Sequence, residues 1–223
     1  MRQTISLAQF YRWLNLYAQQ IEEHEEYLTE LDAAIGDADH GINMQRGMSQ
    51  VRLRIDSSDQ PPIESVGTFL RTIAMTLISS VGGAAGPLYG AFFLRAASTA
   101  NNGDEIDLSH LAVMFRSGLD GVKQRGKAEV NDKTMIDVLE PSVIALEAAV
   151  DAELEPQEAL ANALQAAQAG LKHTIELEAQ KGRASYLGPR SIGHQDPGAT
   201  SSYYLIEAAA QSLGATEDQA MSR

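Results

Sequence analysis

Hydrophobic side chains recur at helical spacing along most of this chain. Phe10, Leu14, Tyr17 and Ile21 follow one another at steps of four, three and four residues. This spacing predicts a helix with one buried face, and Ser6 is placed to cap its start.

The same spacing predicts a series of further helices. They cover residues 27–35, 43–55, 63–79, 87–100 and 108–122, a stretch after Met135 that runs through Val150, and residues 156–180 and 199–213. The acidic run before the second helix indicates either a solvated surface or a kink. No alternating strand pattern of useful length interrupts the series. Amphipathic helices joined by short connections predict a single-domain all-α bundle over residues 1–223, with a frayed tail from residue 215.

Composition and charge narrow the classes of protein that fit. The chain has 223 residues, 44% hydrophobic and only 6% aromatic, which favours closely packed helices. It has no cysteine, so disulfides and thiolate zinc sites are excluded. We find no signal peptide and no apolar run long enough to span a bilayer, and so expect a cytoplasmic protein. The net charge of −13 argues against nucleic-acid and anionic-membrane partners.

Three aspartates fall within eight residues at the end of the second predicted helix. Asp32 ends the apolar run, Gly36 is placed to stop the helix, and Asp37 and Asp39 follow in a short loop. Three converging carboxylates repel one another unless cations lie between them, and hard oxygen ligands suit magnesium or calcium. Magnesium keeps positions for substrate phosphates, so we expect a phosphate ligand. The alternative, that each aspartate only caps a helix or solvates a loop, is less favoured for three at this spacing.

Two well-known binding loops do not fit the chain. A calcium-binding EF-hand beginning at Asp37 needs glycine at its sixth position and glutamate at its twelfth, where the chain has Ile42 and Met48. Residues 121–128 resemble a phosphate-binding P-loop, but Ala128 stands where a serine or threonine is required. A helix, instead of a strand, is also predicted before that stretch.

Two further segments combine glycines with candidate binding chemistry. Residues 79–90 hold four glycines just before a predicted helix, whose exposed amides would attract phosphate or carboxylate. A tight turn between touching helices explains this stretch equally well. Residues 181–199 gather basic side chains and glycines in an otherwise acidic chain, and long loops of this kind are usually functional. If the helices alternate in direction, these loops and the aspartates share one end of the bundle.

Five motifs resemble those of one known family. They are GDADHGxNM at residues 36–44, GGAxGPL at 82–88, DKTM at 132–135, GRASYLG at 182–188 and RSIGHQDPGA at 190–199. The family is the nucleotide-binding subunit of dihydroxyacetone kinase, subunit L. The motifs stand in the family's order, and the resemblance spans nearly the whole chain. It implies an eight-helix antiparallel barrel that binds ADP or ATP through two magnesium ions at one end.

The resemblance also implies roles for individual residues. Asp32, Asp37 and Asp39 would be the magnesium ligands, and Arg183 would be the catalytic cation. The residues implied to bind the nucleotide are His40, Gly41, Ile42, Asn43, Ala84, Ala85, Gly126, Met135, Arg183, Asp196, Pro197 and Gly198. Among these, the two alanines would offer their backbone to phosphate, while Gly126 and Met135 would flank the adenine.

Three positions depart from the family's pattern. Ala85 stands where serine is usual, which leaves only a backbone amide near the phosphates. Asn131 replaces a glycine, and asparagine tolerates a left-handed backbone, so the turn is expected to survive. Pro189 replaces a glutamate, with the loss of one carboxylate.

The resemblance implies a phosphoryl-transfer subunit, because this chemistry needs positioning and charge neutralisation more than a protein nucleophile. Dihydroxyacetone or a related keto-sugar would sit on a separate sugar-binding subunit. ADP would be a retained cofactor, rephosphorylated by a protein of the sugar phosphotransferase system. Three alternatives stay open: a subunit that exchanges ATP in every cycle, a nucleotide-loaded module that signals to a regulator, and a purely structural bundle. A homodimer is also left open.

Overall fold

Helices make up nearly all of the regular structure. The structure is a computed structural model that describes residues 3–57, 63–100 and 103–214. Its α-helices are α1 (Leu7–Glu23), α2 (Glu25–Ile35), α3 (His40–Ile55), α4 (Val66–Ser80), α5 (Ala85–Thr99), α6 (Leu108–Gly126), α7 (Ile136–Asp151), α8 (Pro156–His173) and α9 (Pro197–Ser212). A 3-10 helix, η1 (Arg183–Ser191), precedes α9, and two short strands, β1 (Ile5–Ser6) and β2 (Glu105–Ile106), pair antiparallel.

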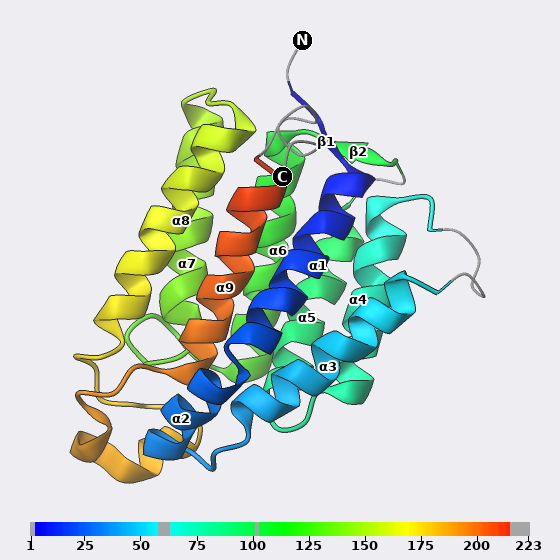
Figure 1. The fold of residues 1–223 in the computed structure, drawn as a ribbon. Helices are drawn as coiled ribbons and strands as arrows, with labels where there is room; N and C mark the ends of the chain where they lie inside the picture. The colour runs from blue at the N-terminus through cyan, green and yellow to red at the C-terminus, as the bar shows by residue number, and fades with distance from the viewer. Residues whose placement is uncertain (1–2, 58–62, 101–102, 215–223) are drawn as a thin grey trace.

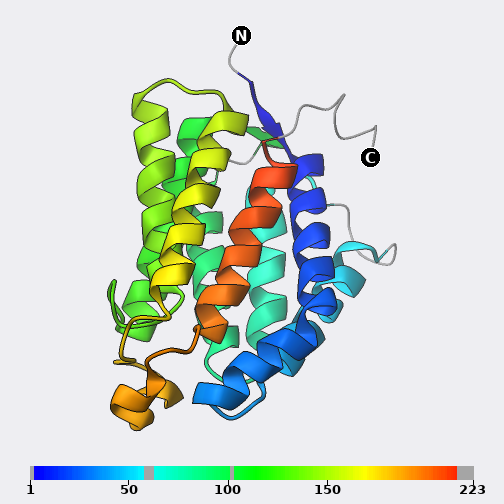
Figure 2. The same cartoon turned by 60° about the vertical axis from the view of Figure 1, so that its left-hand side comes forward.

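Eight of the helices close into a ring of antiparallel neighbours (Figure 1). From α3 to α9 each helix packs against the next along the chain, and α1 closes the ring by contacting both α9 and α3. Helix α2 lies outside the ring, at one end, and packs against α3. The turned view places α2 and η1 at the same end of the ring, opposite β1 and β2 (Figure 2). This arrangement confirms the predicted all-α antiparallel bundle.

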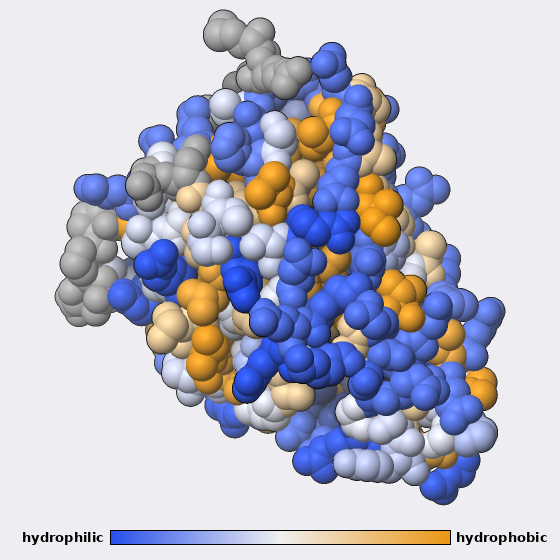
Figure 3. All heavy atoms as spheres, turned by 180° about the vertical axis from the view of Figure 1, so that it is seen from behind, coloured by the Kyte–Doolittle hydropathy of each residue, from blue (hydrophilic) through white to orange (hydrophobic). Residues whose placement is uncertain are grey.

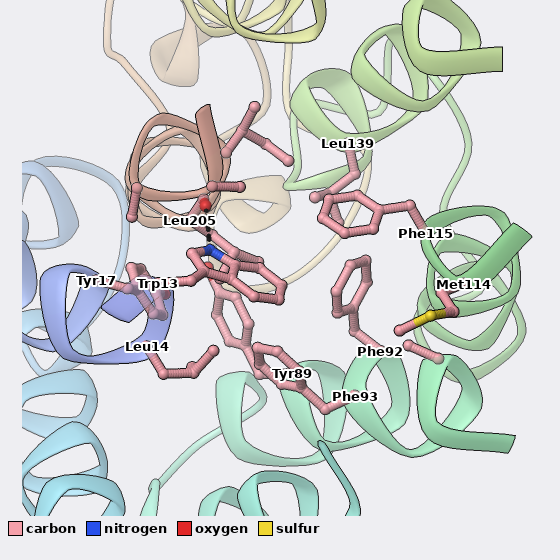
Figure 4. Close-up of a cluster of buried hydrophobic side chains, with 14 of the residues drawn as sticks. Trp13, Leu14, Tyr17, Tyr89, Phe92, Phe93, Met114, Phe115, Leu139 and Leu205 are labelled. Atoms are coloured by element: carbon pink, nitrogen blue, oxygen red, sulfur yellow. Dashed lines mark hydrogen bonds between the residues drawn. The ribbon is translucent and has the colours of Figure 1, made fainter. Parts of the chain in front are cut away.

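Aromatic side chains fill the middle of the ring (Figure 4). The Trp13 ring of α1 stacks on Phe115 of α6 with 5.6 Å between centroids, and Phe92 of α5 meets Phe115 edge-on. The buried indole Nε1 donates a hydrogen bond to the Leu205 carbonyl of α9 at 2.9 Å. Because such rings bury large apolar areas, they hold the helices of the ring at fixed spacing.

Several helix ends differ from the sequence prediction. Helix α8 stops at His173, well short of residue 180, since the Thr174 carbonyl accepts a hydrogen bond from Lys133. Helix α6 continues to Gly126, so most of the rejected P-loop stretch is helical. The helix is interrupted at His24 between α1 and α2, so of the two interpretations left open for the acidic run the structure supports the kink. Ser6 is the residue at the N-cap of α1, as predicted. The predicted frayed tail lies outside the described residues.

The face of the molecule seen from behind is mostly hydrophilic, and its apolar side chains form several separate groups between hydrophilic ones (Figure 3). None of the helices in the described parts of the chain combines the length and apolarity needed to cross a bilayer.

Candidate functional site

The three aspartates converge where α2 gives way to α3. Asp32 is buried in the last turns of α2, and its Oδ2 accepts hydrogen bonds from the backbone amides of Asp39 (2.8 Å) and His40 (3.1 Å). This carboxylate therefore caps α3 across the loop. One carboxylate oxygen of each of Asp32, Asp37 and Asp39 lies within 4.8 Å of the others. Such a group of hard oxygen donors fits magnesium.

Gly36 lets the loop pass directly over Asp32. A Cβ atom added at Gly36 would lie 2.0 Å from Asp32 Oδ1, so any other residue would displace the carboxylate. Gly36 is also the residue that ends α2, as predicted.

The glycine-rich turn before α5 faces the aspartates. Helix α5 begins at Ala85, and no side chain caps its first turn. The amides of such a turn are free to bind an anion. Gly82 is needed because a Cβ there would lie 2.5 Å from Asn43 Oδ1, and Arg46 holds that amide oxygen at 2.7 Å.

The loop between α6 and α7 has an unusual backbone. Lys127, Asn131 and Lys133 adopt positive φ angles of 53°, 74° and 61°. The Asn131 value confirms that asparagine supports the left-handed turn expected there. The buried carboxylate of Asp137 holds the loop by accepting the amides of Asn131 (2.5 Å) and Thr134 (2.7 Å).

The segment between α8 and α9 brings Arg183 to the aspartates. Arg183 opens η1, and its Nη2 lies 2.9 Å from Asp37 Oδ2. The Arg183 side chain is 68% exposed, so it remains accessible to a ligand in the cavity. Pro189, the third departure from the family pattern, lies inside η1.

These four segments enclose one cavity of about 600 Å³. This volume falls in the range of small-molecule sites. The residues named from the sequence that line it are Asp32, Asp37, Asp39, His40, Asn43, Ala84, Ala85, Gly126, Met135, Arg183, Asp196, Pro197 and Gly198.

Two of the residues named from the sequence do not line the cavity. Gly41 packs against α2, where a Cβ would lie 2.0 Å from the Glu25 carbonyl oxygen. The Ile42 side chain is on the surface and 49% exposed. We therefore assign Gly41 to helix packing and give Ile42 no side-chain role in the cavity.

Burial sets the charge of two groups at the cavity wall. It lowers the pKa of His40, whose Nε2 lies 2.9 Å from Ser201 Oγ, so the ring favours its neutral form. Burial also raises the pKa of Asp196 to about 7, although its Oδ2 accepts the Ala199 amide at 2.7 Å. Desolvation disfavours the charged form in both cases.

The sequence prediction missed several residues of the cavity wall. They are Gly82, Gly83, Pro87, Leu88, Tyr89, Val122, Arg125, Ala128, Lys133, Thr134, Ile136, Lys181, Gly182 and Ala184, with Ile35 and Gly36 beside the aspartates. Many stand in or next to the motifs already quoted, so adjacency was an available signal. Tyr89 directly follows the motif at 82–88, but nothing in the sequence indicated that its hydroxyl would lie against Ser201 (2.8 Å) and Ser202 (3.0 Å) of another helix.

Known proteins match both the sequence and the fold. The DAK2 domain family model matches residues 34–211. The PEP-dependent dihydroxyacetone kinase, ADP-binding subunit DhaL, of Escherichia coli (strain K12) is 46% identical over 204 residues, covering 92% of this chain and 96% of that protein. The PTS-dependent counterpart of Lactococcus lactis subsp. lactis (strain IL1403) is 43% identical over 195 residues, covering 87% and 92%.

A solved structure shares the helical ring. The crystal structure of the dihydroxyacetone kinase of C. freundii in complex with AMP-PNP and Mg²⁺ superimposes with a TM-score of 0.66 at 27% identity, covering 90% of this chain and 33% of that one. Its native form gives a TM-score of 0.69 at 26% identity, with the same coverage. These matches confirm the resemblance seen in the five motifs: the chain belongs to the DAK2 domain family, which includes the ADP-binding subunits of dihydroxyacetone kinases.

Proposed function

We propose that this chain is the nucleotide-binding, phosphoryl-transfer subunit of a dihydroxyacetone kinase. The observation that carries the proposal is that three aspartates, an uncapped helix start and Arg183 line the same cavity. In this proposal the cavity holds ADP or ATP, and the sugar is presented by a separate sugar-binding subunit.

The aspartate cluster would hold magnesium. Asp32 is fixed by two backbone amides, so its position does not depend on an ion, while Asp37 and Asp39 approach it from the loop. Two magnesium ions on these three carboxylates would neutralise phosphate charge in a chain whose net charge is −13.

The remaining polar groups have complementary tasks. The first-turn amides of α5, at Ala84 and Ala85, would bind phosphate oxygens through the backbone alone. Arg183 would exchange its contact with Asp37 for the transferring phosphoryl group, where a positive charge stabilises the transition state. Gly126 and Met135 would flank the base, and Asp196, Pro197 and Gly198 would close the wall at the start of α9.

We further propose that ADP is a retained cofactor, rephosphorylated by a relay protein of the phosphotransferase system. The support comes from relatives. Those with 43–46% identity and more than 90% coverage of their own length are named PEP- or PTS-dependent subunits. L-erythrulose 1-kinase of Mycolicibacterium smegmatis is 31% identical, and only 34% of its length is covered.

The test follows labelled ADP through turnover. The protein is loaded with radiolabelled ADP and mixed with the sugar-binding subunit and dihydroxyacetone. Either a phosphorylated relay protein or ATP is then supplied. We expect turnover with the relay protein while the label stays bound. Turnover with ATP alone, with label lost in every cycle, would contradict the retained cofactor and favour the ATP-exchanging alternative.

A further inference from the structure

Lys133 is buried in a way that its place in a loop does not explain. Among the residues that the structure describes, it is the only buried lysine or arginine, with 1% of its surface exposed. A lysine is almost never fully buried unless its ammonium group is paired. Its backbone is also left-handed, with φ at 61°, which a residue with a side chain adopts only when its surroundings enforce it.

The Lys133 ammonium group joins both ends of one long segment. We call residues 174–196, between α8 and α9, the cap segment. Nζ of Lys133 donates hydrogen bonds to the carbonyl of Thr174, where the segment leaves α8, and to that of His194, where it returns towards α9, each at 2.5 Å. These partners lie 41 and 61 residues away along the chain.

Other contacts secure the same two ends. The Gly193 amide donates to the Ile175 carbonyl at 2.8 Å, and the Gln180 amide donates to the Asp132 carbonyl at 3.0 Å. Burial lowers the pKa of Lys133, and the nearby charges of Asp196 and Asp137 oppose this shift by favouring the protonated form. A single cation thus links the α6–α7 loop, the cap segment and the start of α9.

We propose that Lys133 is a positioning residue whose ammonium group fixes both ends of the cap segment and thereby places Arg183 against the aspartate cluster. Arg183 lies within the cap segment, and its guanidinium group meets Asp37 at 2.9 Å only while the segment is held over the cavity. Without the two bonds of Nζ, the segment would keep its backbone bonds at Gly193 and Gln180 and its apolar contact with Ile35. It would lose the one group that ties its two ends together, and we expect it to open more often. The consequence for nucleotide binding rests on the proposed function, but the opening of the segment does not.

Limited digestion with trypsin measures this opening directly, because the cap segment carries cleavable residues at Lys181, Arg183 and Arg190. Lys133→Met keeps a long unbranched side chain but removes the donors. Lys127→Met is the matched control, since Lys127 lies in the same loop, is also left-handed, and is exposed. We expect cleavage at the three cap sites to accelerate at least about tenfold in Lys133→Met and to stay unchanged in Lys127→Met. Cleavage after Arg54 and Arg95, outside the cap segment, should not change.

A conservative variant and a binding measurement complete the test. Lys133→Arg keeps a charged donor, so it should restore cap cleavage most of the way to the wild-type rate, and Mg-ADP affinity should follow the same order. Equal acceleration at all sites, or none at the cap, would overturn the proposal. If Lys133→Met does not fold, the milder Lys133→Gln takes its place and amide exchange is compared with that of the wild type. Faster exchange at Gln180 and Gly193 with exchange in α9 unchanged supports the role proposed for Lys133, and unchanged exchange at both amides refutes it. A wild type that binds no Mg-ADP contradicts the proposed function, while the cleavage rates still test Lys133.

Discussion

Two aspartates begin two helices in the same way at opposite ends of the ring, yet they behave differently as acids. Asp107 caps α6 beside β2 and accepts the His110 amide at 2.8 Å. Asp196 caps α9 at the cavity and accepts the Ala199 amide at 2.7 Å. The hydrogen bond from His110 lowers the pKa of Asp107, whereas burial raises the pKa of Asp196 to about 7.

The difference in pKa reflects the different surroundings of the two carboxylates at the two ends of the ring. Asp107 is partly exposed, so its charge stays solvated and the cap is stabilising in the ordinary way. Asp196 is buried, and its desolvation raises its pKa more than the Ala199 amide and the charge of Lys133 lower it, while the nearby charges of Asp137 and Asp32 add to the rise. The cavity end thus gathers acidic groups that water cannot fully stabilise, an arrangement typical of functional sites.

Substitutions at the two ends of the ring should differ most in their effect on Mg-ADP affinity, and the aspartate cluster should give the largest effect. We expect Asp37→Asn to weaken Mg-ADP binding on the order of 100-fold or more, because each phosphate contact would pass through a cation that the carboxylates hold. Asp107→Asn, at the other end, should leave the affinity unchanged. Isothermal titration calorimetry measures both variants. Unchanged affinity in Asp37→Asn would mean that the cluster is structural.

Replacing Arg183 should affect phosphoryl transfer much more than it affects the stability of the fold. Arg183→Ala should slow phosphoryl transfer roughly 30-fold, because a positive charge at the transferring group is lost. Its exposed ion pair with Asp37 should contribute only about 0–1 kcal/mol to folding, so the melting temperature of the nucleotide-free protein should barely move. Single-turnover transfer and thermal melting test the two effects. A large fall in melting temperature with transfer intact would identify a structural salt bridge instead.

The two caps should give opposite pH dependences of stability, and this is the smallest expected effect. The folded pKa of Asp196 lies above its unfolded value of 3.8, so the folded state binds the extra proton, and stability falls as pH rises from about 4 to about 7. The folded pKa of Asp107 lies below 3.8, so its contribution is present above pH 4 and is lost as pH falls further.

Melting temperatures measured over this pH range, in the presence of a chelator, test the prediction for Asp196 and Asp107. Relative to Asp196→Asn, the wild type should lose a few degrees of melting temperature between pH 4 and pH 7. Compared with Asp107→Asn, the wild type should have the higher melting temperature above about pH 4 and lose this difference only below about pH 4. If the melting temperatures of both variants follow the same pH dependence, burial does not make Asp196 and Asp107 differ as acids.

Features formed by residues close together in the sequence could be predicted without the structure. Asp32, Asp37 and Asp39 fall in one short stretch, and Gly36 between them ends α2, so their convergence could be predicted without the fold. Helical spacing predicted the all-α bundle for the same reason, since each buried face repeats within a few residues. The closed ring itself was implied only by the family resemblance.

Contacts between distant segments could not be predicted. The alanine-rich spacing runs past His173, but α8 ends there because Lys133 of the α6–α7 loop binds the next carbonyl. Gly41 stands inside a binding motif, yet the close approach of α3 to α2 explains it. The end of α8 and the role of Gly41 are both determined by contacts with another segment of the chain, which the local sequence pattern does not show.

The single tryptophan gives this protein a built-in optical reporter of folding. Trp13 is buried where α1, α6 and α9 meet, stacked on Phe115 and bonded to the Leu205 carbonyl, and it does not line the cavity. Its emission should shift to longer wavelength when the ring of helices comes apart and stay nearly constant when a ligand enters. Fluorescence therefore reads the integrity of the scaffold separately from occupancy of the site, in every variant, without an added label.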